Sequence, residues 1–224
     1  MYRSVPRLIA AGLLVAGAVA GCGGAARAPS EPGVAPEART PTTAAGPART
    51  DVGRRPPTAA DVHFMTGMIH HHAQALLIAG WAPTHGASQA VRILCERIIV
   101  GQQDEIDLMQ RWLRDWREPV PAADPSHAGM PGMHHPMMPG MLTAEQLAQL
   151  DAARGADFDR LFLTFMIQHH EGALTMVQQL LGAPGAARDD NVFKFVSDMN
   201  ADQTTEIDRM HTMLAALASA GRDP

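Results

Sequence analysis

The chain has 224 residues, of which 46% are hydrophobic and only 4% aromatic, and its formal net charge is −5. This length suits one folded domain with appended segments. The mildly negative charge, without a long basic run, argues against a nucleic-acid partner. The 2 cysteines stand far apart in the sequence, and if Cys22 carries a lipid, Cys95 is a lone thiol without an internal disulfide partner. The 14 methionines are the unusual feature, because thioethers either fill irregular cores or bind soft metals.

The N-terminus is typical of an export signal. Arg3 and Arg7 precede an apolar run at residues 8–20, and small residues precede Cys22. This pattern predicts a signal peptide at residues 1–21, and the position of the cysteine is typical of a bacterial lipobox. We therefore expect an exported protein that is anchored in the cell membrane through a lipid on Cys22 and faces the extracytoplasmic side. A plain secretory signal with an incidental cysteine fits less well, and the run is short of the roughly 18–20 residues of a membrane span.

The next segment has no apolar periodicity. Residues 22–57 are rich in Pro, Ala, Gly and Thr. Such a composition cannot bury a core, so it predicts a disordered tether between the lipid anchor and the folded domain.

A sequence repeat organises the rest of the chain. Residues 61–76 align without a gap on residues 159–174, and residues 102–109 are echoed by residues 203–210. The residues of the first copy that meet an identical residue are Asp61, Phe64, Thr66, Met68, Ile69, His71, His72, Ala75 and Leu76. The folded part is therefore a duplicated pair of segments.

Apolar periodicity and breakers predict four main helices, over residues 58–79, 88–116, 157–181 and 190–218. Two similar hairpins with short internal connections and one long connection between them predict an all-α fold. The expected domain, residues 58–220, is a four-helix bundle with a long middle crossover.

Capping boxes refine these boundaries. Thr58 with Asp61 is typical of the start of the first helix, and Thr143 with Gln146 predicts a short extra helix in the crossover. Gly155 is expected to end that short helix.

Helical spacing places chemically active side chains on the core faces. These are Met68 and His72 on the first helix, Gln102, Glu105 and Met109 on the second, Met166 and His170 on the third, and Gln203, Glu206 and Met210 on the fourth. Buried imidazoles and carboxylates are costly unless they are paired or bound to a metal. Only one histidine of each pair, His72 or His170, is expected to point fully inward, and the other, His71 or His169, is expected to lean to the side of its helix.

Two interpretations of this layer stay open. In the first it is only a polar core, in which His72 forms a hydrogen bond with Glu105 and His170 forms one with Glu206. Gln102 and Gln203 would then accept hydrogen bonds from the remaining donors. In the second it binds a metal. An oxygen-activating di-iron site is disfavoured, because the Glu-x-x-His motif of such bundles is missing.

A Met/His/Gly/Pro segment at residues 127–141 gives the more specific signal. Its candidate ligands are Met130, Met133, His134, His135, Met137 and Met138. Thioethers and imidazoles on a Gly/Pro-punctuated loop can fold around Cu(I), and methionine needs no deprotonation to bind. The alternative is a low-complexity linker whose methionines dock on the bundle.

The sequence offers little for catalysis. Cys95 lies on an apolar helix face without a neighbouring histidine, which predicts a buried, inert thiol. No Gly-rich phosphate loop follows a strand pattern. We expect no enzymatic activity and no organic cofactor.

The combined motifs resemble the family called domain of unknown function 305, over residues 61–217. The resemblance implies a ferritin-like four-helix bundle, export in bacteria and, in some members, copper binding. The metal positions that it implies are His71, His72, Met68, Glu105 and Met109, with His169, His170, Met166, Glu206 and Met210. Gln168 replaces His70 in the second copy and Glu171 replaces Ala73, so the two halves cannot be chemically equivalent.

The leading hypothesis is therefore a lipid-anchored extracytoplasmic protein that binds Cu(I), with Ag(I) as a chemical mimic, for sequestration or handover. The alternative is a structural or interaction bundle whose His–Glu layer binds no metal.

Overall fold

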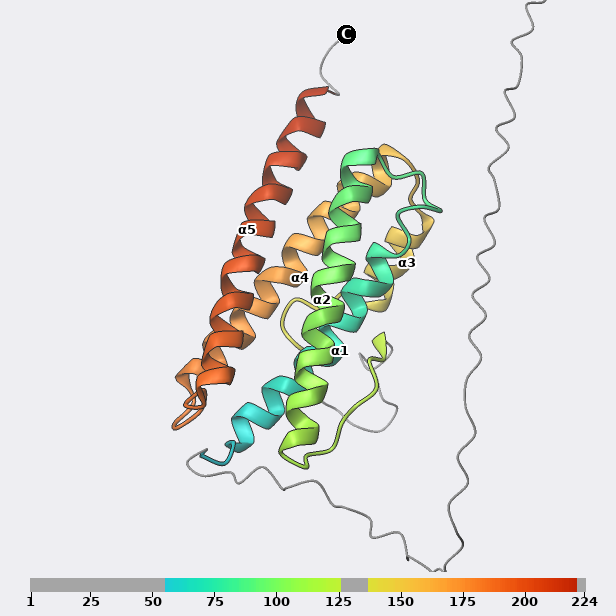
Figure 1. Ribbon diagram of the computed structural model, residues 1–224. Helices are drawn as coiled ribbons and strands as arrows, with labels where there is room; N and C mark the ends of the chain where they lie inside the picture. The colour runs from blue at the N-terminus through green and yellow to red at the C-terminus, as the bar shows by residue number, and fades with distance from the viewer. Residues whose placement is uncertain (1–54, 126–136, 221–224) are drawn as a thin grey trace, which may run out of the picture. The chain divides into compact units, whose positions relative to one another are not determined.

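The computed structural model describes residues 55–125 and 137–220 (Figure 1). The predicted signal peptide, the lipidation site at Cys22 and most of the predicted tether lie outside these residues. So do Met130, Met133, His134 and His135. Within the described ranges every regular element is helical, which confirms the all-α fold class. None of the described helices is long and apolar enough to cross a membrane.

The helices follow the predicted order. They are α1 (Ala59–Ala79), α2 (Gln89–Asp115), α3 (Ala144–Ala152), α4 (Ala156–Gly182) and α5 (Asp190–Ala220). The four long helices form the two predicted hairpins, and α3 is the short helix expected in the crossover between α2 and α4.

Local chemistry fixes the helix starts. The Thr58 hydroxyl accepts a hydrogen bond from the Asp61 amide at 3.2 Å, and the Asp61 carboxylate accepts one from the Thr58 amide at 2.8 Å. This is the predicted capping box, and Thr143 forms the same arrangement with Gln146. Gly155 ends the connection after α3 and directly precedes α4. Its φ is +59, a value that glycine adopts readily because it has no Cβ.

The hairpins pack through their first helices. α1 packs on α2, α4 packs on α5, and α1 meets α4 at the centre, while α3 lies against α4 (Figure 1). The outer helices α2 and α5 are not among the closely packed pairs. The central contact between α1 and α4 therefore joins the two halves of the repeat.

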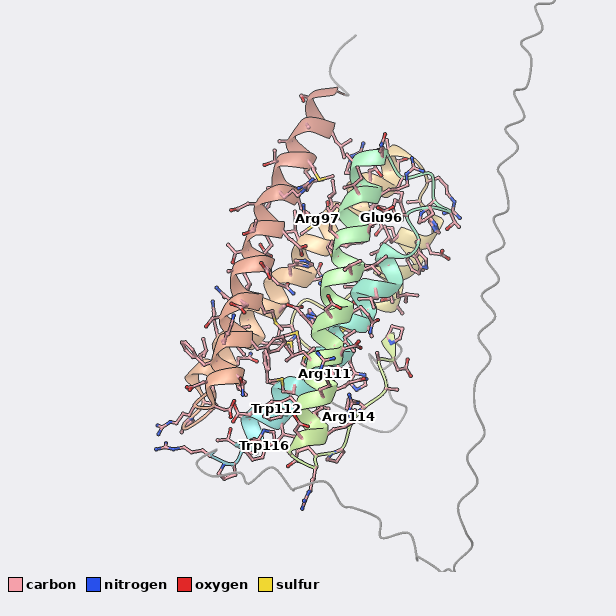
Figure 2. The ribbon with its side chains drawn as sticks, in the orientation of Figure 1. Glu96, Arg97, Arg111, Trp112, Arg114 and Trp116 are labelled. Atoms are coloured by element: carbon pink, nitrogen blue, oxygen red, sulfur yellow. The ribbon has the colours of Figure 1, made fainter. Side chains whose placement is uncertain are left out.

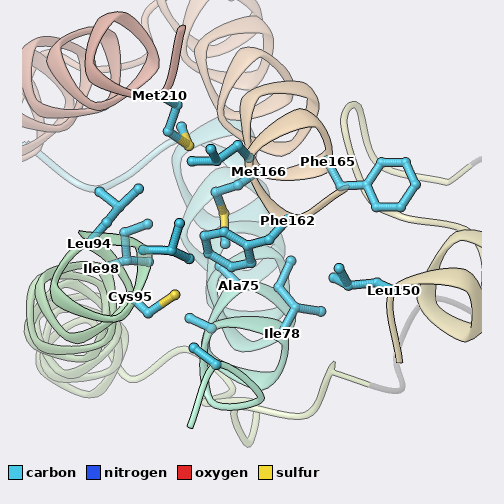
Figure 3. Packing of buried hydrophobic residues seen from close by; sticks show 14 of the residues in the cluster. Ala75, Ile78, Leu94, Cys95, Ile98, Leu150, Phe162, Phe165, Met166 and Met210 are labelled. Atoms are coloured by element: carbon cyan, nitrogen blue, oxygen red, sulfur yellow. The ribbon is translucent and has the colours of Figure 1, made fainter. Parts of the chain in front are cut away.

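Two clusters of buried side chains form the core. The Phe162 cluster combines the second half of α1 with the first half of α4, as Figure 3 shows for Ala75, Ile78, Phe162 and Met166. The Met65 cluster combines the first half of α1 with the second half of α4. The helices α1 and α4 are therefore antiparallel, and the His-His pairs lie between the two clusters.

Cys95 belongs to the Phe162 cluster and is 2% exposed (Figure 3). Burial raises the pKa of its thiol to about 12, and the nearby Asp159 acts in the same direction. The thiol is therefore protonated at neutral pH, which agrees with the prediction of a buried cysteine.

Candidate metal centre

The four histidines of the repeat form one layer at the centre of the bundle. His71, His72, His169 and His170 all have 0% exposure. His71 and His169 lie to the side of His72 and His170, as expected, but that side is buried as completely as the other. α1 packs on both α2 and α4, so two of its faces are buried, and the side on which His71 lies is the face against α4. We call these four residues the histidine layer.

His71 and His169 stack across the contact between α1 and α4. Their ring centroids are 3.8 Å apart and the ring planes meet at 37°. Consecutive histidines on one helix are farther apart, with centroids 6.3 Å apart in each pair. The closest imidazole pair therefore contains one residue from each half of the repeat.

Burial keeps these two rings neutral. It lowers the pKa of His71 to about 3, with a smaller contribution from the charge of neighbouring His72. Burial also holds the pKa of His169 well below its usual range, and the nearby His71 lowers it further. A neutral imidazole carries a free lone pair and does not have to lose a proton before it binds a metal.

The other two histidines are held by carboxylates. His72 Nε2 lies 2.6 Å from Glu105 Oε2, and His170 Nε2 lies 2.7 Å from Glu206 Oε2. A carboxylate accepts, so each Nε2 carries a proton and points at its carboxylate. These two pairs are the ones that the sequence predicted. They fit a polar core, and they equally fit the carboxylate–histidine arrangement that orients metal ligands.

Several ring nitrogens in the layer have no hydrogen-bond partner within the described residues. They are His71 Nδ1, His72 Nδ1, His170 Nδ1 and both ring nitrogens of His169. Buried polar atoms are nearly always paired, so a group of orphaned imidazole nitrogens is unusual and favours a bound ligand at this layer.

The expectation that Gln102 and Gln203 complete this polar network was wrong. Neither amide atom of Gln102 has a partner in the described part of the chain, and neither does Gln203 Oε1. The two side chains face a cleft between α2 and α5 instead.

Methionines flank the histidine layer on both sides. Met68 and Met109 lie in the Met65 cluster, whereas Met166 and Met210 lie in the Phe162 cluster. The four predicted methionines are all fully buried. Repeat-equivalent residues fall in different clusters because α1 and α4 run in opposite directions.

The predicted metal ligands did not include the other core methionines. Met176 and Met199 also belong to the Met65 cluster, and Met138 from the crossover packs against it. Helical spacing places Met199 on the core face of its helix and could have placed Met176 there too, but it carries no information on the crossover.

The end of the Met/His segment docks on the histidine layer. The His71 Nε2–H donates to the main-chain carbonyl of Pro139 at 3.1 Å. A Cβ placed on Gly67, one turn before His71, would lie 3.3 Å from the sulfur of Met138 and 3.5 Å from the methyl carbon of Met176. Met138 therefore lies against α1 one turn before the histidine layer, while Met137 is 47% exposed.

Two glycines make this docking feasible. A Cβ on Gly172 would overlap the carbonyl oxygen of Pro139, and one on Gly140 would come within 2.6 Å of the carbonyl oxygen of Gln168. Gly140 also has φ +77. The crossover can approach α4 this closely only where both side chains are missing.

Differences between the two repeat copies hold the crossover in place. Gln74 of the first copy clamps Leu142, donating to its carbonyl at 3.1 Å and accepting from its amide at 2.7 Å. Gly172 stands at the equivalent place in the second copy. His70 contacts the carbonyl of Asp124 at 3.3 Å, and its counterpart Gln168 bonds Gln146 at 2.9 Å. The two halves therefore differ in sequence where the crossover contacts the bundle. These differences are visible in the alignment of the two repeat copies.

The described residues contain no group of three or more His, Cys, Asp or Glu side chains arranged to hold a metal. A metal site at the histidine layer would therefore need additional ligands. These would come from methionine sulfur atoms, from side chains at the exposed end of the crossover, or from both. Met130, Met133, His134 and His135 stay predictions, since they lie outside the described ranges.

Comparison with protein families gives a direct assignment. The sequence profile described as Domain of unknown function (DUF305) matches residues 61–214. The chain belongs to the DUF305 family. This confirms the family expected from the repeated His-His motif and its partners. No curated protein sequence matches the chain.

Solved structures agree with the DUF305 fold. A DUF305 protein from Streptomyces coelicolor is 26% identical, with a TM-score of 0.60 over 71% of this chain and 94% of that one. A DUF305 fragment from Deinococcus radiodurans is 29% identical, with a TM-score of 0.61 over 72% and 99%. CopM in its Cu(II)-bound form is 29% identical, with a TM-score of 0.56 over 70% and 96%. CopM has also been solved in Cu(I)-bound and Ag-bound forms.

Proposed function

We propose that this DUF305 protein binds copper as Cu(I) through imidazole and thioether ligands, and that its role is sequestration or handover rather than catalysis. The observation that carries the proposal is the stack of His71 on His169. Two neutral, fully buried rings with orphaned nitrogens lie between two methionine-containing clusters. Imidazole and thioether are the ligands that Cu(I) favours.

The docked crossover supports a shared role for loop and bundle. Pro139 accepts a hydrogen bond from His71, and Met138 packs one turn away, so the described end of the Met/His segment lies beside the stacked rings. CopM, a relative of similar fold, binds copper and silver. Silver is a soft ion like Cu(I), which agrees with a site built from sulfur and imidazole.

The proposed location is the extracytoplasmic side of the cell membrane, with a lipid on Cys22 as the anchor. The signal-like sequence at residues 1–21 supports export, and the Streptomyces coelicolor relative is described as a candidate secreted protein. An exported copper protein would meet the metal before it reaches the cytoplasm.

A structural role is the second candidate function. The hydrogen bonds from His72 to Glu105 and from His170 to Glu206 are short, and both imidazole rings are fully buried. This is expected for a polar layer that fixes the register of the helices. In that case the bundle would act as an interaction module and bind no metal.

A competition titration separates the two candidates. The full chain is titrated with Cu(I) under anaerobic, reducing conditions against a chromophoric chelator. Copper binding predicts stoichiometric capture from the chelator. If the folded protein takes no copper from even a weak competitor, the copper proposal is wrong and the structural candidate stands.

Substituting Met130, Met133, Met137 and Met138 by Leu then locates the ligands. Leucine keeps the apolar volume, so helicity is expected to remain while the affinity for Cu(I) falls. The matched control is Met213→Leu, because Met213 packs on the Phe162 cluster in α5, far along the sequence from the crossover. Equal affinity of all three proteins would exclude the Met/His segment as a source of ligands.

A further inference from the structure

A second polar site lies in the cleft between α2 and α5. The cleft has a volume of about 240 Å³. Its polar lining from α2 is Arg97, Gln102 and Glu105, and from α5 it is Asp202, Gln203, Thr205 and Glu206. The repeated Gln-x-x-Glu motif supplies the same two side chains from each half. Figure 2 marks the position of Arg97 on α2.

The amide side chains of this cleft lack partners. Gln102 is 4% exposed and Gln203 is 3% exposed. Gln102 Oε1, Gln102 Nε2 and Gln203 Oε1 make no hydrogen bond to any described residue. Leaving such atoms without a partner costs free energy. Orphaned amide oxygens on two glutamines that line one cleft from different helices therefore favour a ligand that binds oxygen, such as a cation.

Carboxylates give the cleft an excess of negative charge. Glu105 and Glu206 use Oε2 to accept from His72 and His170, and their side chains are 20% and 24% exposed. Asp202 lines the same cleft, so three carboxylate side chains border it. Arg97 is the one basic residue among those that line the cleft.

We propose that this cleft binds a hard divalent cation, of the Mg²⁺, Ca²⁺ or Mn²⁺ class, together with part of its water shell. Carboxylate and amide oxygens are the ligands that these ions prefer. The described side chains form no compact group of three carboxylates, so water has to complete the coordination. At roughly 30 Å³ for each water molecule, the cleft has room for an ion with several waters.

The position of the site suggests what the cation does. α2 and α5 are not among the closely packed helix pairs, and the cleft separates them. A cation shared by Glu105 and Glu206 would join the outer helices of the two hairpins. Binding to the folded state alone would raise the melting temperature. This inference does not rest on the proposed copper site, which uses sulfur and imidazole.

A Mn²⁺ titration tests the site directly. The full chain is stripped of metal with a chelator, and the signal of free Mn²⁺ is followed by electron paramagnetic resonance. We expect one Mn²⁺ bound for each chain, displaced by excess Ca²⁺ or Mg²⁺. Absence of bound Mn²⁺ in the folded protein would overturn the proposal.

Three substitutions and one control assign the ion to the cleft. Gln102→Leu and Asp202→Asn are expected to weaken Mn²⁺ binding roughly tenfold. Arg97→Gln should strengthen it, because a competing positive charge is removed. Asp208→Asn removes an exposed carboxylate of α5 that does not line the cleft, and should leave binding unchanged. Equal binding by the wild type, Gln102→Leu and Asp202→Asn would overturn the proposal.

Thermal melts distinguish a ligand role of the Gln102 amide from a purely structural one. Gln102→Leu should raise the melting temperature of the metal-free protein, because it removes orphaned buried atoms, and should reduce the increase caused by Mn²⁺. A lower melting temperature with an unchanged Mn²⁺ effect would show that the amide is structural, against the proposal. Substituting His71 and His169 by Gln should leave Mn²⁺ bound, and its loss would place the ion at the histidine layer instead.

Discussion

The stacked rings of His71 and His169 can only share a buried interface while both are neutral. Two imidazolium ions at a centroid separation of 3.8 Å would repel each other, and neither has water to solvate it. The same burial that keeps the rings neutral leaves their lone pairs ready for a metal. A single arrangement therefore serves both the packing of α1 on α4 and the proposed chemistry.

The neutral rings predict a loss of stability in acid. In the unfolded chain a histidine gains a proton as the pH falls through 6.5, whereas His71 in the folded protein stays neutral down to a pKa of about 3. The unfolded state then binds more protons, so the free energy of unfolding falls as the pH drops from 6.5 toward 3. The expected slope is roughly 1 kcal/mol per pH unit for each of His71 and His169.

Urea denaturation between about pH 7.5 and about pH 5 measures this slope. The control replaces His71 and His169 by Gln, which keeps polar side chains of similar size and removes the titration. The variant should show a flatter dependence on pH. An identical slope in the two proteins would mean that other groups cause the acid sensitivity.

At the scale of elements, the crossover is held by two close approaches to the bundle. Pro139 and Gly140 lie directly against Gly172 on α4, and Gln74 on α1 clamps Leu142. The main chain that leads into the Met/His segment is thus fixed next to His71. Any metal bound by Met138 and its neighbours would sit at a defined place on α1.

A pair of glycine substitutions tests this docking. Gly172→Ala would force a Cβ into the Pro139 carbonyl oxygen, and we expect a loss of roughly 1–3 kcal/mol in the free energy of unfolding. Gly101→Ala on α2 places a Cβ with no atom within 4 Å, so it should stabilise the protein by about 0.5–1 kcal/mol. Urea denaturation compares the two. A gain from Gly172→Ala equal to that from Gly101→Ala would contradict the close approach.

The sequence predicts the helices well because helix signals are local. The caps at Thr58 and Thr143, the break at Gly155 and the apolar period were enough to place each long helix within a residue or two. The pairs His72–Glu105 and His170–Glu206 were also predictable, since both members repeat on core faces.

The stacking of His71 on His169 was not predictable in the same way. It depends on which face of α1 meets α4, and a helical wheel carries no information on the neighbouring helix. The docking of Pro139 on His71 depends on contacts between segments far apart in the chain. Its one trace in the sequence is the set of places where the repeat copies differ, such as Gln74 against Gly172.

At the scale of the molecule, duplication sets the organisation. Each half contributes a hairpin with a His-His pair on its first helix and a Gln-x-x-Glu motif on its second. Antiparallel packing of α1 on α4 joins the histidine pairs in the centre, and the Gln-x-x-Glu motifs face one another in the cleft between α2 and α5. The duplication thus places imidazoles and thioethers together in the core, and amide and carboxylate groups together in the cleft.

The most direct test of copper binding at the histidine layer is X-ray absorption at the copper edge. The full chain is loaded with one equivalent of Cu(I) under anaerobic, reducing conditions. We predict a mixed first shell of sulfur and nitrogen with the scattering pattern of imidazole, which weakens when His71 and His169 are replaced by Gln. A shell of sulfur alone, or of oxygen alone, would contradict a copper site that includes the histidine layer.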